Sequence, residues 1–506
     1  MIFHHSHTCI LGALFLAAVC TAEIKLYYTV PSIVPLDATP LDSTPVGVSL
    51  EFFMWPSYMT NVTPSVSCMS RISEIYGKKT PIRIGGTTQD RATYDPYFDD
   101  YVFYRVADPL NAPDTLIYGP KFWDLIRFNR GDDNQTNTYL AVQEAKKRAL
   151  DHLWAIELGN EPDGIEARIP PGWLQTTCHT NIRAVIVYIW AHKPDAVSPW
   201  NASQEGLDAA NWAQGFIDVW KSPLPILTAG SYAVAYADNP EWPNTDYLIH
   251  TAYNNTVKAA VKYYSGHLYA APPGNNTLAI EMNHAKTVSD LAVLGERAST
   301  AASINSSYIL GETNFHPYDV DMDATFGAAI AALDKSMRAV TLGIQRLFFH
   351  QGTINQALFN WWSEAHINAP YYGGYFAALA LAGGDHIIEL DSGNSSHAQY
   401  VIYSHGCPIK AILVNTDYFS GSGVRSCSKI TLNGLSAGSQ VRTLRMTAAS
   451  SDVTTNDPGI YPTIGGQHFS NVDCSSVGDL KYERGAVRGG QVTLTVAASE
   501  ALLVYL

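Results

Sequence analysis

The sequence has 506 residues, of which 46% are hydrophobic, and its formal net charge is −14. This length exceeds one compact domain of usual size and allows a large core with a smaller second domain. Only 32 residues are Lys or Arg, and no basic run stands out. The composition argues against nucleic acids and sulfated polyanions as partners, because binding them depends on clustered cations.

The first 22 residues predict a cleaved secretory signal peptide. An apolar core from Ile10 to Val19 precedes small residues and Glu23, and it is too short to span a membrane. We therefore expect a secreted, extracellular monomer that has no membrane partner. Asn-x-Ser/Thr motifs fit N-glycosylation of such a protein. They lie at Asn61, Asn134, Asn201, Asn254, Asn275, Asn305 and Asn394.

Five cysteines follow the predicted cleavage site, which is an odd number for an oxidising compartment. They are Cys68, Cys178, Cys407, Cys427 and Cys474. We expect disulfides and one free thiol. Cys407 with Cys427 is the preferred pair because both lie in the C-terminal region, although Cys474 could replace either. No Cys-x-x-Cys motif occurs, so neither a structural zinc nor a redox role is indicated.

The mature chain opens with an isolated strand and then a buried one. Glu23–Tyr28 alternates in hydrophobicity and is followed by a proline-containing stretch up to residue 45, which predicts a strand that crosses to another domain. Val46–Phe53 predicts the first buried strand and contains Glu51. A buried carboxylate costs free energy unless it is paired or belongs to a site. Glu51 is therefore either a site residue or a solvated residue just past the strand end.

Strand and helix patterns then alternate, which is typical of an α/β fold with a parallel sheet. Pro81–Asp90 predicts a strand that ends in a Gly-Gly turn, and we expect its Arg83 to pair with a neighbouring acid. Trp123–Arg130 predicts another strand, and Thr138–Leu150 has the spacing of a helix.

The most informative stretch is Leu153–Gly164, an apolar run that ends abruptly in Gly-Asn-Glu-Pro. It places Glu161, preceded by Asn160, at the C-terminal end of a buried strand, which is where barrel enzymes carry their chemistry. A lone Asn-Glu-Pro would be an ordinary strand-end turn. Ser307–Phe315 repeats the design, however, because its apolar run ends in Gly and then Glu312.

Two carboxylates at the ends of two buried strands are the groups that glycoside hydrolysis needs. One gives its proton to the leaving oxygen, and the other stays ionised and either attacks the anomeric carbon or activates water. Between them, Lys262–Tyr269 predicts a strand on which His267 and Tyr269 share one face. For each of these two residues, the sequence leaves two roles open: a residue of the active site, or a buried residue of the core.

The remaining elements complete a barrel and a second domain. Strands are also predicted at Pro225–Ser231 and Arg346–Phe349, and helices at Ala324–Leu342 and Tyr375–Ala382. This gives eight strand candidates and a (β/α)₈ TIM barrel with Glu161 on the fourth strand and Glu312 on the seventh. From Asp385 onward only short alternating runs appear, which predict an antiparallel β-sandwich. These runs are Gln399–Ser404, Ile409–Val414, Ser428–Leu432, Val441–Met446 and Gln491–Ala497.

Two further segments stand near the predicted site. The loop Thr313–Asp323 carries several acids and His316, but one histidine among acids lacks the geometry of a metal site. We expect neither a metal nor a cofactor. Phe359–Trp362 is predicted to offer aromatic surface at the rim of the barrel.

Asn-Glu-Pro followed by Gly-Glu-Thr resembles the retaining clan A glycosidases, specifically glycoside hydrolase family 79, which holds heparanase and microbial β-glucuronidases. The resemblance implies that Glu161 is the acid/base and Glu312 the nucleophile, and that Asn160 binds the sugar 2-hydroxyl. It also implies substrate contacts for Glu51, His267 and Tyr269. The implied domains are residues 23–45 as a strand joining the sandwich, 46–384 as the catalytic barrel and 385–506 as the sandwich.

For the substrate, the resemblance implies terminal β-D-glucuronic acid or its O-methyl ether on a carbohydrate such as arabinogalactan. The acidic chain lacks the basic patches that cleavage inside a sulfated polyanion requires. Tyr318 is followed by Asp319 and Val320, where the heparanase branch has a Gly pair that binds the uronate carboxylate. That role would therefore fall to Tyr318, Asn360, Trp361 or nearby backbone amides.

Two alternatives remain open. One is an exo-glycosidase of the same clan that acts on a neutral sugar. The other is a catalytically silent glycan-binding protein on a glycosidase scaffold, because fold does not dictate function. The presence of both carboxylates with their flanking residues argues against silence.

Overall fold

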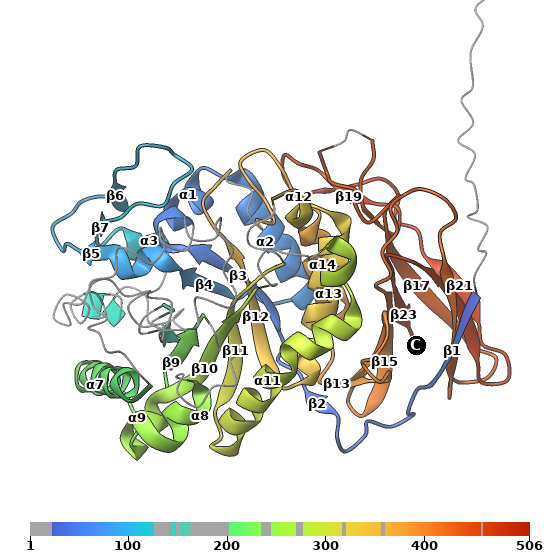
Figure 1. Ribbon diagram of the computed structural model, residues 1–506, viewed down its shortest axis with the longest axis horizontal. Helices are drawn as coiled ribbons and strands as arrows, with labels where there is room; N and C mark the ends of the chain where they lie inside the picture. The colour runs from blue at the N-terminus through green and yellow to red at the C-terminus, as the bar shows by residue number, and fades with distance from the viewer. Residues whose placement is uncertain are drawn as a thin grey trace, which may run out of the picture.

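A computed structural model of the chain shows a barrel-like domain packed against a β-sandwich domain (Figure 1). It describes residues 23–125, 141, 143–144, 146–147, 154–157, 160–161, 202–233, 244–269, 277–315, 320–355, 360–456 and 459–506. The predicted signal peptide, most of the predicted helix Thr138–Leu150 and Cys178 lie outside these residues.

Within the described residues, the barrel domain contains seven parallel strands in the order β4-β3-β12-β11-β10-β9-β8. β12, the last strand of the barrel sheet along the chain, pairs with β3, the first, which is the closure that a (β/α)₈ barrel requires. Strands β4 and β8 form the two ends of the described sheet. The bounds are β3 (Val46–Glu51), β4 (Ile82–Gly85), β8 (Ile156–Glu157), β9 (Leu227–Tyr232), β10 (Val261–Leu268), β11 (Ser307–Thr313) and β12 (Ile344–Gln351).

The strand predicted at Trp123–Arg130 is wrong over its first residues. Trp123, Asp124 and Leu125 belong to helix α3 (Phe122–Leu125), and the rest of that prediction falls outside the described residues. The helix lies beside a small sheet of three strands, β5 (Ala92–Tyr94), β7 (Leu116–Tyr118) and β6 (Val102–Tyr104). Phe122 and Trp123 are buried against Tyr118, so the apolar run serves a local aromatic cluster.

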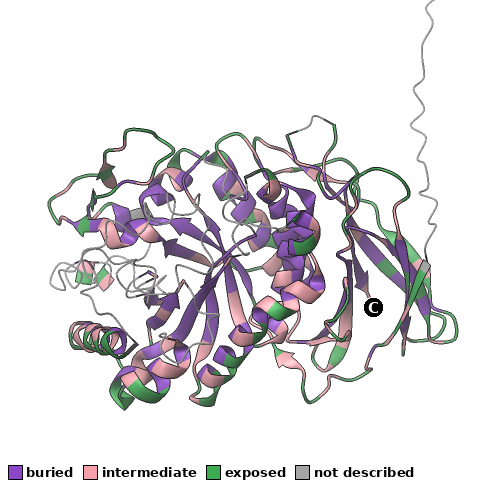
Figure 2. Cartoon of the chain, viewed as in Figure 1, coloured by how far each residue is buried: buried purple, intermediate pink, exposed green. Residues whose placement is uncertain are grey.

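Helices cover the sheet on its outer side, and the strands form a buried centre (Figure 2). Helix α13 is buried along most of its length because α14 packs on it and the sandwich strand β13 contacts it as well. The bounds are α1 (Trp55–Thr60), α2 (Thr63–Tyr76), α7 (Ala202–Trp220), α8 (Thr245–Tyr247), α9 (Asn255–Ala260), α10 (Leu278–Glu281), α11 (His284–Ser303), α12 (Val320–Asp323), α13 (Phe326–Thr341) and α14 (Pro370–Leu381), with single turns η1 (Phe52–Met54), η2 (Thr87–Arg91) and η5 (Leu248–Ala252).

The second domain has two main sheets that enclose their own apolar cluster. The larger runs β18-β17-β23-β15-β14-β13-β2, with β21 on β17, and the smaller runs β1-β16-β22. The bounds are β1 (Glu23–Thr29), β2 (Thr39–Pro40), β13 (His386–Glu389), β14 (His397–Ser404), β15 (Cys407–Asn415), β16 (Cys427–Asn433), β17 (Gln440–Thr447), β18 (Thr463–Ile464), β19 (His468–Phe469), β20 (Ser476–Val477), β21 (Glu483–Ala486), β22 (Val492–Ala497) and β23 (Glu500–Tyr505).

The N-terminal strand lies at the far side of the molecule from the barrel sheet (Figure 1). Strand β1 pairs in parallel with β16, from Glu23 opposite Cys427 to Thr29 opposite Asn433. The chain then returns through β2, which pairs with β13. The first residues of the described chain are thus part of the C-terminal sandwich.

The preferred cysteine pairing is wrong. Cys68 of α2 is bonded to Cys474, which follows β19, and Cys407 is free and exposed. Cys427 is also disulfide-bonded. The Cys68–Cys474 bond joins residues 406 positions apart, so the contact depends on how the two domains dock. Among the described helices, none is long and apolar enough to cross a membrane.

Candidate active site

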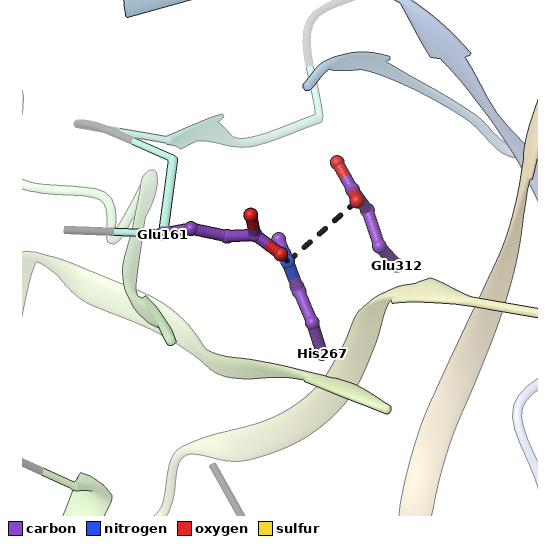
Figure 3. Close-up of side chains that lie close together, drawn as sticks. All are labelled: Glu161, His267 and Glu312. Atoms are coloured by element: carbon purple, nitrogen blue, oxygen red, sulfur yellow. Dashed lines mark hydrogen bonds and ion pairs between the residues drawn. The ribbon is translucent and has the colours of Figure 1, made fainter. Parts of the chain in front are cut away.

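The two predicted glutamates meet at one end of the sheet, on either side of His267 (Figure 3). Glu161 follows β8, His267 lies in β10 and Glu312 lies in β11. The Nδ1 atom of His267 is 2.9 Å from Glu161 Oε1 and 3.7 Å from Glu312 Oε2. One carboxylate oxygen of Glu161 lies within 4.8 Å of one of Glu312.

The backbone presents both His267 and Glu161 in irregular geometry. A register shift between Gly266 and His267 places His267 opposite Glu312 on β11. Glu161 has φ of 42°, and its N–H donates to the carbonyl of Ser231, whose φ is 56°. Positive φ is strained for residues with a Cβ, and such strain is concentrated at functional sites.

Glu312 is the more buried of the two carboxylates. Its side chain is 6% exposed, against 19% for Glu161. Its Oε1 accepts from Arg83 Nη1 at 2.7 Å and its Oε2 accepts from Tyr269 OH at 2.7 Å. Burial alone would raise the pKa of Glu312, but the charges of His350, His267 and Arg83 outweigh it and hold the pKa far below its usual range. Glu312 is therefore ionised.

Arg83 fulfils the prediction that it pairs with neighbouring acids. Besides Glu312, its guanidinium donates to both oxygens of Glu157, to Asn160 Oδ1 at 2.9 Å and to Ser49 Oγ at 2.9 Å. Burial would lower the pKa of Arg83, but Glu157 and Glu312 raise it. The cation thus fixes Asn160 and Glu312 relative to each other.

Glu51 is buried, and both of its carboxylate oxygens have protein partners. Oε1 accepts from the backbone N–H of Thr88 at 2.9 Å and from the Thr88 hydroxyl. Oε2 lies 3.2 Å from His350 Nε2. A Cβ at Gly86 would come within 2.3 Å of this carboxylate, so the predicted Gly-Gly turn makes room for Glu51.

Tyr269 donates to Glu312, and its hydroxyl stays protonated because burial and the two glutamates raise its pKa well above the usual value.

Asn360 is 1% exposed. Its amide donates to Tyr58 OH and to the carbonyl of Thr353, and its Oδ1 accepts from the N–H of Gly352. Tyr318 lies outside the described residues.

The exposed aromatic surface predicted at Phe359–Trp362 is wrong for its tryptophans. Trp361 and Trp362 are fully buried. Trp361 packs against Phe349 of β12 and Tyr371 of α14. A Cβ at Gly374 of α14 would come within 2.2 Å of the Trp361 ring. The close approach of α14 therefore encloses the ring.

Sequence reasoning missed three buried polar residues of this array, which are Ser49, Glu157 and His350. Ser49 Oγ lies 3.0 Å from His350 Nδ1. Glu157 had a signal, because it interrupts the apolar strand before Glu161 on the face opposite Trp154, Ile156 and Leu158. His350 falls one residue beyond the strand predicted at Arg346–Phe349, and β12 extends through it.

Two groups of described residues have the ligand types of a metal site, Glu161 with His267 and Glu312, and His284 with Glu389 and Asp391. In the first, Arg83 already supplies a cation to Glu312. In the second, both ring nitrogens of His284 contact carboxylates. Both clusters thus balance their negative charge with protein cations.

The arrangement suits acid–base and nucleophilic chemistry at one carbon. Glu312 is an ionised carboxylate held by Arg83 and Tyr269, and Glu161 is a second, more exposed carboxylate on the opposite side. Carboxyl groups about 5–5.5 Å apart serve double displacement, whereas wider separations of about 6.5–9.5 Å accommodate a water for single displacement.

Comparisons with known proteins identify the family. The family model for the glycosyl hydrolase family 79 C-terminal beta domain matches residues 399–503. A β-glucuronidase of Aspergillus niger is 26% identical over 428 residues, covering 76% of this chain and 73% of the relative. A β-glucuronidase of Neurospora crassa is 27% identical over 412 residues, covering 74% of this chain and 69% of the relative.

Among solved structures, the 4-O-α-L-rhamnosyl-β-D-glucuronidase of Fusarium oxysporum 12S, in complex with Rha-GlcA, matches with a TM-score of 0.83 and 34% identity. The match covers 95% of this chain and 100% of the Fusarium chain. The α-L-arabinofuranosidase of Thermotoga maritima shares the fold at a TM-score of 0.54 and 11% identity, over 95% of this chain and 99% of that chain. The chain is a glycoside hydrolase and belongs to glycoside hydrolase family 79.

Proposed function

We propose that this protein is a retaining exo-β-glucuronidase that removes terminal β-D-glucuronic acid, or its O-methyl ether, from glycans such as arabinogalactan side chains. The observation that carries the proposal is the pair of carboxylates at the ends of β8 and β11, with oxygens within 4.8 Å. This separation fits double displacement rather than a single displacement by water.

In the first step, Glu312 attacks the anomeric carbon and Glu161 gives its proton to the leaving oxygen. In the second step, Glu161 takes a proton from water, whose oxygen bonds to the anomeric carbon while Glu312 departs. Arg83 and Tyr269 hold Glu312 in place through both steps. Asn160, whose Oδ1 accepts from Arg83 at 2.9 Å, would bind the sugar 2-hydroxyl in this proposal.

The choice of glucuronic acid rests on the relatives. The two curated relatives and the most similar of the solved structures described above are named as glucuronidases. The acidic chain, with a net charge of −14, fits the end of a weakly charged glycan better than the interior of a sulfated polyanion.

A second candidate substrate is glucuronic acid that carries a 4-O-α-L-rhamnosyl group. The Fusarium enzyme named for this substrate is 34% identical over 95% of the chain, whereas the Aspergillus and Neurospora β-glucuronidases are 26% and 27% identical over 76% and 74%. An enzyme of this kind would release a disaccharide rather than free glucuronic acid.

The test compares nitrophenyl β-D-glucuronide with its 4-O-α-L-rhamnosyl derivative, using nitrophenyl β-D-galactoside and α-L-arabinofuranoside as neutral-sugar controls. We expect turnover of a glucuronide by the natural protein and a loss of more than about 100-fold in Glu312→Gln and Glu161→Gln. Preference for either glucuronide decides between the two substrates. Turnover of only a neutral sugar would retain the glutamates and reject glucuronic acid, and glycan binding without turnover of any substrate would indicate a silent protein.

We also propose that the protein is secreted and N-glycosylated. Four of the glycosylation motifs lie in residues that the structure describes, and the asparagine of each is exposed. They are Asn61, Asn254, Asn305 and Asn394. The Cys68–Cys474 disulfide fits an oxidising compartment. Expression in a eukaryotic host, followed by mass analysis with and without a peptide-N-glycosidase, tests the proposal; retention inside the cell without a mass shift would contradict it.

A further inference from the structure

His350 is a buried histidine beside the proposed nucleophile that the reaction described above does not use. It lies in β12 opposite Ser49 of β3 and is 4% exposed. Its Nε2 is 3.2 Å from Glu51 Oε2, and its Nδ1 is 3.0 Å from Ser49 Oγ and 3.8 Å from Glu312 Oε1. The ring therefore bridges two carboxylates on different strands.

The proton positions follow from the partners. An ionised carboxylate only accepts hydrogen bonds, so Nε2 carries the proton that faces Glu51. Burial disfavours the charged ring, but Glu312 and Glu51 outweigh burial and the repulsion from Arg83, and the pKa of His350 is raised. An ionised Glu312 thus favours the protonated ring of His350, which adds to the positive charge of Arg83 and His267 around this carboxylate.

The charge balance shows why positive charge at His350 matters. Three buried carboxylates, Glu51, Glu157 and Glu312, share Arg83 and His350. Arg83 divides its donors between Glu157 and Glu312, with one further bond each to Asn160 and Ser49. Without His350, Glu51 would lose this partner, and Glu312 would keep Arg83 and His267 but lose one of three nearby sources of positive charge. In a site of low dielectric constant, each such charge interaction is strong.

We propose that His350 is a positioning residue for the second half of the reaction, where it acts as a fixed cation that stabilises Glu312 as the departing carboxylate. This proposal rests on the double displacement described above. As the bond between the anomeric carbon and Glu312 breaks, its electron pair stays on Glu312, the water oxygen bonds to the anomeric carbon and the water proton passes to Glu161. The negative charge that returns to Glu312 then faces the imidazolium of His350, which Glu51 and Ser49 hold in place.

The test replaces the charge but keeps a hydrogen-bonding side chain. His350→Gln offers an amide toward Glu51, and His350→Asn offers one toward Ser49. Ser49→Ala alters the same hydrogen-bond network without changing its charge. As a control far from the site, His386→Gln replaces a histidine of β13 in the sandwich. Each is assayed with a dinitrophenyl glycoside, for which release of the first product needs little acid assistance.

We expect both His350 variants to lower kcat by about 10-fold or more and to lower KM with it, because the glycosyl-enzyme accumulates. A burst of dinitrophenol should appear in rapid mixing. The acidic limb of kcat/KM should move up by about one pH unit or more, since a one-unit pKa shift is a tenfold change in the ionisation equilibrium. Ser49→Ala should leave that limb in place, and His386→Gln should match the natural protein.

An equal loss of kcat and kcat/KM, with no burst and an unmoved acidic limb, would overturn the proposal in favour of a purely structural role. So would a Ser49→Ala variant with the same kinetic changes. If neither His350 variant folds, the pH dependence of inactivation of the natural protein by a 2-deoxy-2-fluoro glycosyl fluoride still provides an outcome that rejects the proposal. The inactivation rate should stay constant down to about pH 4, and a decline near the ordinary glutamate pKa of about 4.3 would reject the cationic pocket.

The two proposals fail separately. Absence of glucuronide turnover in the natural protein rejects the proposed substrate. The ratio of variant to natural rates tests His350 on any aryl glycoside that the natural protein hydrolyses.

Discussion

The backbone of Glu161 links the proposed chemistry to local strain. With φ of 42°, it occupies the left-handed region, which costs a residue with a Cβ about 1–2 kcal/mol and glycine almost nothing. Its N–H is held by the carbonyl of Ser231, itself at positive φ. The turn after β8 thus aims the carboxylate at His267 and Glu312 at the expense of local stability.

Replacement of Glu161 by glycine should therefore abolish activity and yet give a more stable protein than replacement by alanine. Both variants lack the carboxylate, but only alanine keeps the strained Cβ. We expect an unfolding free energy for Glu161→Gly at least about 0.5–1 kcal/mol higher than for Glu161→Ala, after the greater flexibility of unfolded glycine is included. Chemical denaturation measures it, and a less stable glycine variant would contradict the strain.

Gly311, which precedes Glu312, should not tolerate a side chain. A Cβ there would lie 2.5 Å from Ser265 Oγ and 3.4 Å from His267 Nε2. We expect Gly311→Ala to displace Glu312 and to lower kcat/KM by about 100-fold or more, because small misplacements of reacting groups are costly. Ser265→Ala removes the conflicting oxygen, so the double variant Gly311→Ala/Ser265→Ala should recover much of the loss. Additive losses in the double variant would show that the contact is not the cause.

At the scale of elements, the sequence predicts well what a local pattern encodes. The strands that carry Glu161 and Glu312 are apolar runs cut short by glycine and polar residues, and β11 and β12 follow their predicted positions closely. The helical content of Phe122–Leu125 and the burial of Trp361 were not predictable in this way. An aromatic run has the same composition in a strand, a helix or a rim, and Trp361 is enclosed by α14, which is distant in sequence.

The residues of the site divide in the same way, into those that a local sequence pattern predicts and those that depend on distant contacts. Asn160, Glu161, Tyr269 and Glu312 stand at pattern boundaries that sequence reasoning can find. The bridge from Glu51 through His350 to Glu312 spans β3, β12 and β11, and only the register of neighbouring strands brings these residues together. Similarly, nothing local pairs Cys68 with Cys474, because the partner of a cysteine is set by the docking of distant elements.

The Cys68–Cys474 disulfide should be a major stabilising link between α2 and the loop after β19. It closes a segment of 406 positions, and removal of a native disulfide costs about 2–5 kcal/mol. We expect the double variant Cys68→Ser/Cys474→Ser to lower Tm markedly while Cys407→Ser, at the free exposed thiol, leaves Tm unchanged. Equal Tm values for the double variant and the natural protein would show that the link contributes little.

At the scale of the whole molecule, the barrel and the sandwich dock through charge as well as apolar packing. Helix α13 lies between the barrel sheet and the sandwich (Figure 1). His284, the first residue of α11, lies 2.9 Å from Asp334 of α13 and 3.0 Å from Asp391, which follows β13. Arg338 of α13 pairs with Glu389 of β13. The imidazolium of His284 is thus shared by the two domains.

Replacement of His284 by glutamine should destabilise the protein and separate the unfolding of its domains. Removing one partner from a buried ionic group costs about 3–5 kcal/mol because the remaining charges are left uncompensated. We expect Tm to fall and calorimetry to resolve two transitions where the natural protein shows one. A single transition at an unchanged Tm would contradict a coupling role. His386→Gln provides the matched control, because it alters a half-exposed histidine of β13, the strand that carries Glu389.

The pH dependence of this loss has a definite sign. Burial disfavours the protonated ring, but Asp334, Asp391 and Glu389 outweigh it and raise the pKa of His284 from 6.5 to about 12. A raised pKa gives stability that is complete below the unfolded value and declines as pH rises toward the folded value. The difference in unfolding free energy between the natural protein and His284→Gln should therefore be constant from about pH 5 to 6.5 and then shrink by at most about 1.4 kcal/mol per pH unit. Urea denaturation at several pH values up to about 9 measures it, and a difference that grows with pH would show that His284 is neutral in the folded protein.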